Sequence, residues 1–407
     1  MHDARSLSPV RRLGVLIAAT ALVAAGCGSA AGGGSDSSAK SSEPYHILAV
    51  LALSGAFQSL GKGTVDALNV SADLVNKSGG VGGRKIELEF VDDQGDPTKA
   101  VSILQAKINE RKPDAAIAGS TSNESLAMLP ILNRNKIINL GTNSSTKLND
   151  PAKYPYTFRP VDPNENIAKA TAQLFVAKGY KKIGIFTPNS ASGDSGKAAF
   201  TAAVQKAGLT TVTASYGASD VDVTAPLAQL QTGHPDAVIF LALGDAAPGV
   251  VLSSRLKAGM TAVPFYGDQS VTVDVTKLVP PAALQGAYVS TYSTSIKPAG
   301  GNPRSLAEFI DAVKARGPIV STILAYTLAA DCLRLLQAGA KTAGSTDADK
   351  MKTAIENLPD EPAGTWLTYS RMKFSPQNHF NIGTAAADYG STQIGHWTDG
   401  QFVTAAS

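Results

Sequence analysis

Short apolar runs rich in β-branched residues alternate with stretches of helical spacing from Tyr45 onward, and this alternation limits what the chain can fold into. The pattern runs once to about residue 140 and begins again after Phe158. Such alternation predicts parallel sheets covered by helices on both faces, and two successive sets predict two α/β lobes. Strands are expected at 46–53, 85–91, 115–118, 136–140, 182–186, 237–243 and 263–266, and helices at 65–75, 100–108, between 118 and 136, and at 166–178, 197–207 and 249–258.

The N-terminus has the parts of an export signal. Three arginines supply positive charge before residue 13, and residues 13–25 form an apolar run too short to cross a bilayer as a helix. Small residues then lead into Cys27 and resemble the lipobox of bacterial lipoproteins, with Ala24 where that motif usually has Leu. The resemblance implies a lipoprotein signal peptide over 1–26 and a lipid on Cys27. An ordinary secretory signal is the alternative, and the pair Arg11-Arg12 leaves the twin-arginine route open beside the general one.

Residues 27–43 are expected to form a flexible linker, because 28–42 consists almost entirely of Gly, Ser and Ala. A Gly-rich coil of roughly 15 residues reaches about 20 Å. We therefore expect an exported protein, lipid-anchored to the outer face of the cell membrane or periplasmic, whose folded part is held clear of the headgroups.

Charge and cysteine content exclude some partners. The 407 residues carry a formal net charge of +3, of which the signal (three Arg against Asp3) accounts for +2. A balance this close to neutral gives no reason to expect a nucleic acid partner. Cys332 is the one cysteine after Cys27, so no disulfide is expected in the folded part. It lies in a helical apolar pattern over 324–336 and is expected to be a small core residue.

A known family becomes recognisable in the loops after the expected strands. The residues that carry the likeness are Leu51-Ala52-Leu53-Ser54-Gly55 with Leu60-Gly61, Gly79-Gly80-Val81-Gly82-Gly83-Arg84-Lys85-Ile86, Val91-Asp92-Asp93-Gln94 with Asp96-Pro97, Phe158-Arg159-Pro160, Gly193-Asp194, Phe374-Ser375-Pro376 and Gln401-Phe402-Val403. Over nearly all of 45–404 the chain resembles the leucine/isoleucine/valine-binding family, the type 1 periplasmic solute-binding proteins of ABC importers. The glycines of 79–83 also suit a tight reversal, because glycine adopts positive φ readily.

The resemblance implies the architecture and the partners. It implies the type 1 periplasmic binding fold, an α/β fold with two doubly wound parallel-sheet lobes joined by three hinge strands. Lobe 1 is expected over 44–158 plus about 290–360, and lobe 2 over 159–289 plus about 361–407. A branched-chain or related amino acid would bind between the lobes and pass to an ABC permease and its ATPase. The alternative solutes are an amide, a urea-like compound or a small organic acid, and the alternative role is a ligand-sensing lipoprotein that signals to a membrane receptor.

The first-lobe site is expected after the third strand. Thr121 and Glu124 have capping-box spacing, and the helix N-terminus that they would begin attracts a carboxylate. The resemblance implies that Thr121 and Ser122 hold the ligand's α-carboxylate. It implies a second carboxylate arm after the fourth strand, at Thr142, Asn143 and Ser144, with Ser145 as the alternative in an alignment that slips by one residue.

The second lobe departs from the family's pattern. The family has aromatic residues where this chain has Ser192 and either Leu243 or Gly244, and it has an acid for the ligand's ammonium where this chain has Gln269. A neutral amide cannot pair with a buried cation, so a neighbouring acid would have to replace it. Four further residues complete the candidate site: Asp268 and Asp245 as possible replacement acids, and Phe57 and Leu60 as apolar contacts.

No enzyme is expected. Gly193-Asp194-Ser195-Gly196 resembles the nucleophile loop of chymotrypsin-like proteases, but that chemistry needs a histidine base and an oriented acid, and the five histidines form no such pattern. Residues 55–62 nearly match a phosphate-binding loop, but five residues rather than four separate its glycines. No His/Cys cluster has metal-ligand spacing, so neither a metal nor a cofactor is expected.

Overall fold

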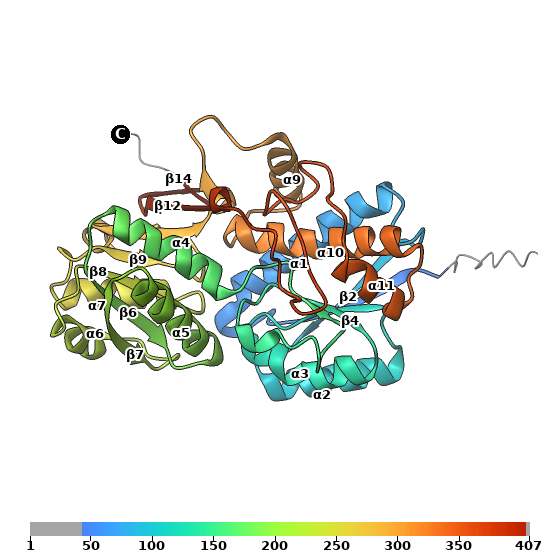
Figure 1. Ribbon diagram of the computed structural model, residues 1–407, viewed down its shortest axis with the longest axis horizontal. Helices are drawn as coiled ribbons and strands as arrows, with labels where there is room; N and C mark the ends of the chain where they lie inside the picture. Colours follow the sequence, from blue (N-terminus) through green and yellow to red (C-terminus); the bar gives the residue numbers. More distant parts are fainter. Residues whose placement is uncertain (1–42, 404–407) are drawn as a thin grey trace, which may run out of the picture. The chain divides into compact units, whose positions relative to one another are not determined.

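The computed structural model describes residues 43–403. The expected signal, the lipidation site Cys27 and nearly all of the expected linker lie outside these residues. The described chain forms two α/β lobes, each built on its own sheet (Figure 1). Within it, every helix is too short or too polar to cross a membrane.

The first lobe is built on a wholly parallel sheet with strand order β2-β1-β3-β4-β5. Its strands are β1 (Tyr45–Leu51), β2 (Ile86–Asp92), β3 (Ala115–Ala118), β4 (Ile138–Leu140) and β5 (Thr157–Phe158), and its helices are α1 (Gln58–Lys77), α2 (Pro97–Glu110), α3 (Ser122–Arg134), α9 (Arg304–Lys314), α10 (Ile323–Ala343) and α11 (Ala348–Glu356). Ile47 and Ala49 of β1 pack in the core formed with α1 and α10, while Leu48 and Val50 pack in the core formed with α2 and α3. Since successive side chains of a strand point to opposite faces, a strand buried on both sides is apolar throughout.

The second lobe repeats this arrangement around a sheet with strand order β12-β10-β9-β8-β6-β7, in which only β12 is antiparallel to its neighbour. Its strands are β6 (Lys182–Pro188), β7 (Thr210–Tyr216), β8 (Ala237–Phe240), β9 (Phe265–Gly267), β10 (Ala287–Tyr292) and β12 (Tyr389–Gln393), and its helices are α4 (Asn164–Ala177), α5 (Ala191–Lys206), α6 (Thr224–Gln231), α7 (Ala247–Lys257) and α8 (Pro281–Leu284). Ile239 of β8 packs in a core with residues of α4 and α5, and Val238 in a core with residues of α6 and α7.

The chain passes between the two sheets three times, at 159–163, 293–303 and 359–388. After the second passage α10 packs along α1, so segments far apart in the sequence lie side by side (orange and blue in Figure 1). Cys332 is fully buried in α10, as expected of a small core residue. A small third sheet of order β11-β14-β13 lies beside the passages: β11 (Ile296–Lys297), β13 (His396–Thr398) and β14 (Gln401–Val403).

The predicted α/β class is confirmed, and each expected strand and helix is present. The clearest difference is at β8, which ends at Phe240 rather than at residue 243. Leu241 N still donates to Phe186 O of β6 at 3.0 Å, and the chain then leaves the sheet, with Leu241 and Leu243 lining the cleft between the lobes. Strands β5, β7 and β10–β14 and helices α6, α8, α9 and α11 were not predicted.

The glycine-rich turn between α1 and β2 has the predicted conformation. Gly79, Gly80, Gly82 and Gly83 have φ angles of 108°, 71°, 60° and 89°. At Gly80 a Cβ atom would also lie 2.0 Å from the carbonyl oxygen of Arg84, so a side chain is excluded by contact as well as by φ.

Candidate ligand-binding site

A cavity of about 130 Å³ lies between the two lobes, where loops that follow strands of both sheets meet. This is the position at which open parallel sheets bind ligands. Eleven of the twelve ligand contacts expected from the sequence line the cavity, and Asp245 does not. The eleven are Phe57, Leu60, Thr121, Ser122, Thr142, Asn143, Ser144, Ser192, Leu243, Asp268 and Gln269.

The first-lobe wall begins with the N-terminus of α3, where the predicted capping box is present. The Thr121 hydroxyl oxygen accepts from Asn123 N at 3.3 Å, and Glu124 Oε2 accepts from Thr121 N at 3.0 Å and also from the Thr121 hydroxyl. Thr121 Oγ1 is therefore engaged in the cap. The Ser122 hydroxyl has no hydrogen-bond partner within residues 43–403, which leaves it and the helix N-terminus to face the cavity.

The loop after β4 forms the second part of this wall. Asn143 Nδ2 donates to Ser120 O at 3.0 Å and its Oδ1 accepts from the Ser125 hydroxyl at 2.6 Å, so its amide joins this loop to the start of α3. Thr142 and Ser144 line the cavity. Ser145, the alternative to Ser144, is buried outside the lining.

A third loop of the first lobe, after β1, is held by Asp92. Its Oδ1 accepts from Leu53 N at 2.9 Å and its Oδ2 from the Ser54 hydroxyl at 2.7 Å. This carboxylate fixes the turn that leads into the 3₁₀ helix η1 (Gly55–Phe57) and α1. Phe57 and Leu60 thereby reach the cavity from a restrained segment.

Asp268, directly after β9, is the acid of the second-lobe wall. It is 3% exposed, and its Oδ1 accepts from Ser270 N at 2.9 Å and from the Ser270 hydroxyl at 2.5 Å. Burial raises the pKa of Asp268 to about 6, against these hydrogen bonds, which lower it. Among residues 43–403, no Lys, Arg or His and no other acid lines the cavity, so Asp268 is the one charged side chain of the described lining.

Gln269 reaches from the second lobe to the first. Its Nε2 donates to Ser144 Oγ at 3.1 Å and to Asn164 Oδ1 at 3.4 Å, and its Oε1 is buried without a partner. The two lobes are therefore in contact across the cleft. Gln269 also lines the cavity, so its Oε1 is an acceptor without a hydrogen-bond partner in the described residues.

Asp245 lies outside the cavity lining. It contacts the first lobe instead: Asp245 N donates to Ala56 O at 2.9 Å, and Asp245 Oδ2 accepts from Ser59 N at 3.0 Å. Of the two acids left open by the sequence, only Asp268 faces the cavity.

Much of the remaining lining was not predicted. Leu324, Ala325 and Leu328 come from α10, some 200 residues after the first-lobe loops in the sequence, and with Leu241 they form an aliphatic wall. Their helical apolar spacing looks the same as that of any core helix, so no local signal distinguished them. Gly244, the alternative to Leu243, also lines the cavity, as does Ser120 at the start of the expected first-lobe loop. Further unpredicted residues that line it are Val161, Asn164, Ser270, Thr272, Tyr292 and Thr322.

Two other features bear on possible chemistry. Ser195, of the protease-like motif, accepts from Thr146 N at 3.4 Å and from Asn164 Nδ2 at 3.2 Å, and no histidine bonds to it within residues 43–403. In the same part of the chain no group of three or more His, Cys, Asp or Glu residues is arranged to hold a metal ion.

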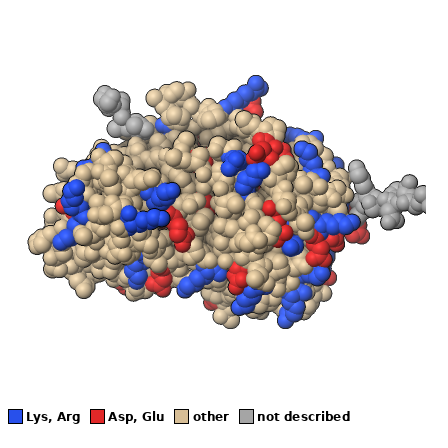
Figure 2. Space-filling view, viewed as in Figure 1, with Lys and Arg blue, Asp and Glu red and all other residues tan. Residues whose placement is uncertain are grey.

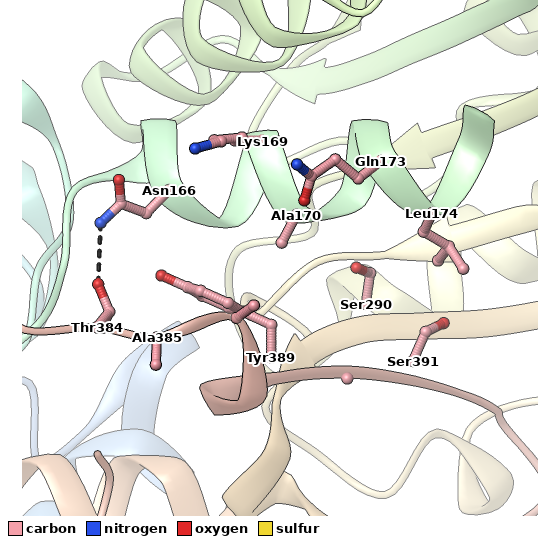
Figure 3. Close-up of a pocket in the computed structure, with 12 residues that line it drawn as sticks. Asn166, Lys169, Ala170, Gln173, Leu174, Ser290, Thr384, Ala385, Tyr389 and Ser391 are labelled. Atoms are coloured by element: carbon pink, nitrogen blue, oxygen red, sulfur yellow. Dashed lines mark hydrogen bonds between the residues drawn. The ribbon is translucent and has the colours of Figure 1, made fainter. Parts of the chain in front are cut away.

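A second, larger hollow of about 420 Å³ lies between α4 and the segment 384–391 and shares no lining residue with the interlobe cavity (Figure 3). Asn166 Nδ2 donates to Thr384 Oγ1 at 3.1 Å and so joins the two sides of the hollow. Lys169 and Gln173 extend from α4 and also line it. Among the described residues that line it, no buried side-chain nitrogen or oxygen is without a partner. Figure 2 shows Lys, Arg, Asp and Glu interspersed on the viewed face, without a large area of one sign.

Two α/β lobes around a small cavity, with one acid facing neutral donors, define a binding protein that encloses a small molecule in its cleft. Residues 44–387 match the model of the periplasmic binding protein family, and the chain belongs to that family.

Relatives and solved structures agree with this assignment. The chain is 27% identical to "Leu/Ile/Val-binding protein homolog 3" of Brucella melitensis over 86% of this chain and 90% of that protein. It shares its fold with the branched-chain amino acid substrate-binding protein LivJ from Streptococcus pneumoniae in complex with isoleucine (TM-score 0.69, 17% identity, 83% of this chain and 94% of that chain). It also shares its fold with an R. palustris solute-binding protein of an ABC transporter in complex with benzoate (TM-score 0.70, 21% identity, 86% and 93%). The type 1 periplasmic binding fold expected from the sequence is confirmed.

Proposed function

We propose that this protein binds a small aliphatic amino acid in the interlobe cavity and delivers it to an ABC importer. The observation that carries the proposal is the division of polarity in the cavity. Neutral donors and a helix N-terminus lie on the first lobe, and a single buried carboxylate, Asp268, lies on the second.

The first-lobe wall suits a carboxylate. The N-terminus of α3 carries backbone N–H groups without intrahelical partners and a partial positive charge. Ser122 and Thr142 add hydroxyl donors that have no partner in the described residues. In this proposal Ser122 donates directly, while Thr121 shapes the helix N-terminus.

The second-lobe wall suits an ammonium. Asp268 can balance a positive charge, and the unpartnered Oε1 of Gln269 can accept a second hydrogen bond from it. In this arrangement Gln269 assists an acid one position earlier in the chain. Leu60, Leu243 and Leu328 leave an apolar space for an aliphatic side chain.

The relatives support the same class of solute. The Brucella protein is named for leucine, isoleucine and valine, and the S. pneumoniae protein was solved with isoleucine. A small organic acid is the second candidate, because burial raises the pKa of Asp268 to about 6 and a neutral carboxyl group would tolerate a ligand without an ammonium. The benzoate complex of the R. palustris protein shows that this fold accommodates such a ligand.

A panel of ligands tests the proposal. We expect aliphatic L-amino acids to raise the free energy of unfolding by about 2.7 kcal/mol at 100 times their Kd, because a ligand that binds only the folded state stabilises it by mass action. Thermal melts with L-amino acids, their amides and small organic acids would measure the effect. If only compounds that lack a carboxylate stabilise the protein, the role given to Ser122 is contradicted. If none of the compounds stabilises it, the proposed function is contradicted.

We propose further that the protein is exported and anchored by a lipid on Cys27, close to the permease and ATPase that it would serve. Cys27→Ala is expected to move it from the membrane fraction to the soluble fraction, because the acyl chains supply the membrane affinity. Immunoblots of fractionated cells measure this, and Cys332→Ala is the matched control, since that thiol is buried. An unchanged membrane fraction for Cys27→Ala would remove the anchor. A lipoprotein that reports its ligand to a receptor stays the alternative role, and transport measurements in a permease-deficient strain separate the two.

A further inference from the structure

The loop after β8 of the second lobe lies against the start of α1 in the first lobe. Two hydrogen bonds join them: between the backbones, Asp245 N donates to Ala56 O at 2.9 Å, and from backbone to side chain, Ser59 N donates to Asp245 Oδ2 at 3.0 Å. The loop after β8 donates in the first bond and accepts in the second, and the pair of bonds fixes the position of the loop relative to the start of α1.

Within residues 43–403, no side chain at the N-cap of helix α1 caps it from the first lobe. Its N-cap position is Phe57, which makes no capping hydrogen bond, and neither does Ser54, the N-cap of the preceding 3₁₀ turn. Ser59 is the second residue of α1, so its N–H has no acceptor within the helix. Asp245 supplies from the opposite lobe the carboxylate that N-cap residues usually supply locally, and its charge is favourable at the positive end of the helix.

The backbone of the loop is shaped for this contact. Gly244 has φ of 99°, and a Cβ atom there would lie 3.2 Å from Ala56 O and 3.8 Å from the ring of Phe57. A glycine therefore lets the loop approach the start of α1 closely. Gly244 and Phe57 both line the cavity, so the contact is at its rim.

Other contacts cross the same cleft. Gln269 Nε2 donates to Ser144 Oγ at 3.1 Å, and Thr146 N donates to Ser195 Oγ at 3.4 Å. Both are neutral hydrogen bonds. Of these three cross-lobe contacts, that of Asp245 alone brings a charge, and charge-assisted hydrogen bonds are roughly twice as strong as neutral ones.

We propose that Asp245 is an interlobe latch, a positioning residue that caps α1 only when the lobes are closed. The proposal rests on the proposed function, a solute enclosed between closing lobes. Asp245 raises the affinity for solute without touching it, because it stabilises the closed state in which a docked solute is held and so slows its release. Opening would return Ser59 N and the carboxylate to water.

The test compares the full-length protein in detergent with Asp245→Ala and Asp245→Asn, and uses L-isoleucine as the probe. Asp245→Ala is expected to weaken binding about 5- to 10-fold, the factor for about 1 kcal/mol of a lost N-cap. The loss should appear in a faster dissociation rate with the association rate unchanged. Asp245→Asn, which keeps an acceptor, should lie between. Asp222→Asn, an exposed acid of the same lobe paired with Lys257, is the matched control and should leave both rates unchanged.

A second readout needs no bound probe. Dyes on Asn109→Cys in α2 and Lys206→Cys in α5, two exposed positions on opposite lobes, report lobe closure by energy transfer. The unliganded Asp245 variants should show a smaller closed fraction than the unliganded parent, and faster hydrogen exchange at Ser59 N–H. Unchanged closure and exchange would overturn the latch. If the Asp245 variants close less than the parent but the parent binds no L-isoleucine, the latch is supported and the proposed function is contradicted. If Asp245→Ala fails to fold, Asp245→Asn decides by the same measurements.

Discussion

Replacing Asp268 by Asn is expected to weaken binding of an aliphatic L-amino acid by a factor of about 100 to 4,000. In the described part of the chain, this carboxylate is the one charged side chain that lines the cavity, so its loss would leave the ligand's ammonium enclosed without a counter-charge. Removing one partner of a buried charge pair costs about 3–5 kcal/mol, and each 1.4 kcal/mol is tenfold in affinity. Titration calorimetry on the parent and the variant measures the change.

The same pairing predicts a pH profile. Burial raises the pKa of Asp268 to about 6 in the unliganded protein, and an ammonium favours the ionised form. Affinity should therefore be constant above about pH 6 and fall about tenfold per pH unit below it, as the carboxyl group takes up a proton that binding must release. In Asp268→Asn the affinity should be low and independent of pH over this range.

Two comparisons make the result specific. Gln269→Ala, next in the chain, removes only a neutral amide and should weaken binding far less than Asp268→Asn. Equal and small effects of both changes would argue against an ammonium in the cavity. An organic acid as the true ligand would bind Asp268→Asn as well as the parent or better, and more tightly at low pH in the parent.

Asp162→Ala is expected to lower the free energy of unfolding by about 3–5 kcal/mol. Asp162 is fully buried where the chain first passes between the lobes, and it accepts hydrogen bonds from three tyrosine hydroxyls. These come from the end of β10 (Tyr292), the third passage (Tyr369) and β12 (Tyr389). Without the carboxylate they lose their shared acceptor, and buried donors left unpaired cost about 1–3 kcal/mol each.

The stability contribution of Asp162 should also depend on pH. Burial raises the pKa of Asp162 from 3.8 to about 6, so the folded state takes up a proton that the unfolded chain does not hold between these values. An acid whose pKa is higher in the folded than in the unfolded state stabilises the fold fully below its unfolded pKa, here about pH 4. This stabilisation is lost as the pH rises through about 6, and the free energy of unfolding falls by about 3 kcal/mol between these limits.

Urea denaturation from pH 4 to 8 measures both effects. Asp162→Asn keeps an acceptor oxygen without the charge, so it should lose less stability than Asp162→Ala and lack this part of the pH dependence. Asp222→Ala removes an exposed acid and should change little. A flat difference between the parent and Asp162→Asn across this range would contradict the assigned pKa.

The elements of the fold that were predicted have local signals. β1 is apolar throughout since both of its faces are buried, and the glycines of 79–83 mark a turn that needs positive φ. The capping box at Thr121 likewise depends on residues three apart, and it is present. Strand β8 was extended too far, because the apolar residues 241–243 look like strand in the sequence but line or border the cleft.

The candidate site was only partly visible, because it depends on contacts between distant segments. Loops at strand ends pointed to eleven cavity residues, yet nothing local separated Asp268 from Asp245. The structure places the first in the cavity and the second against α1. The leucines of α10 were invisible as ligand contacts, because their spacing is that of a core helix.

By itself, the sequence determined the two α/β lobes and the loops at their strand ends, since periodicity and turn chemistry act over a few residues. Only the tertiary structure decided which acid faces the cavity, that Gln269 and Asp245 join the lobes, and that α10 closes the wall beside α1. Those outcomes depend on how the two lobes are oriented by the segments that connect them. The contacts that result join residues more than 100 positions apart in the sequence, so local patterns do not show them.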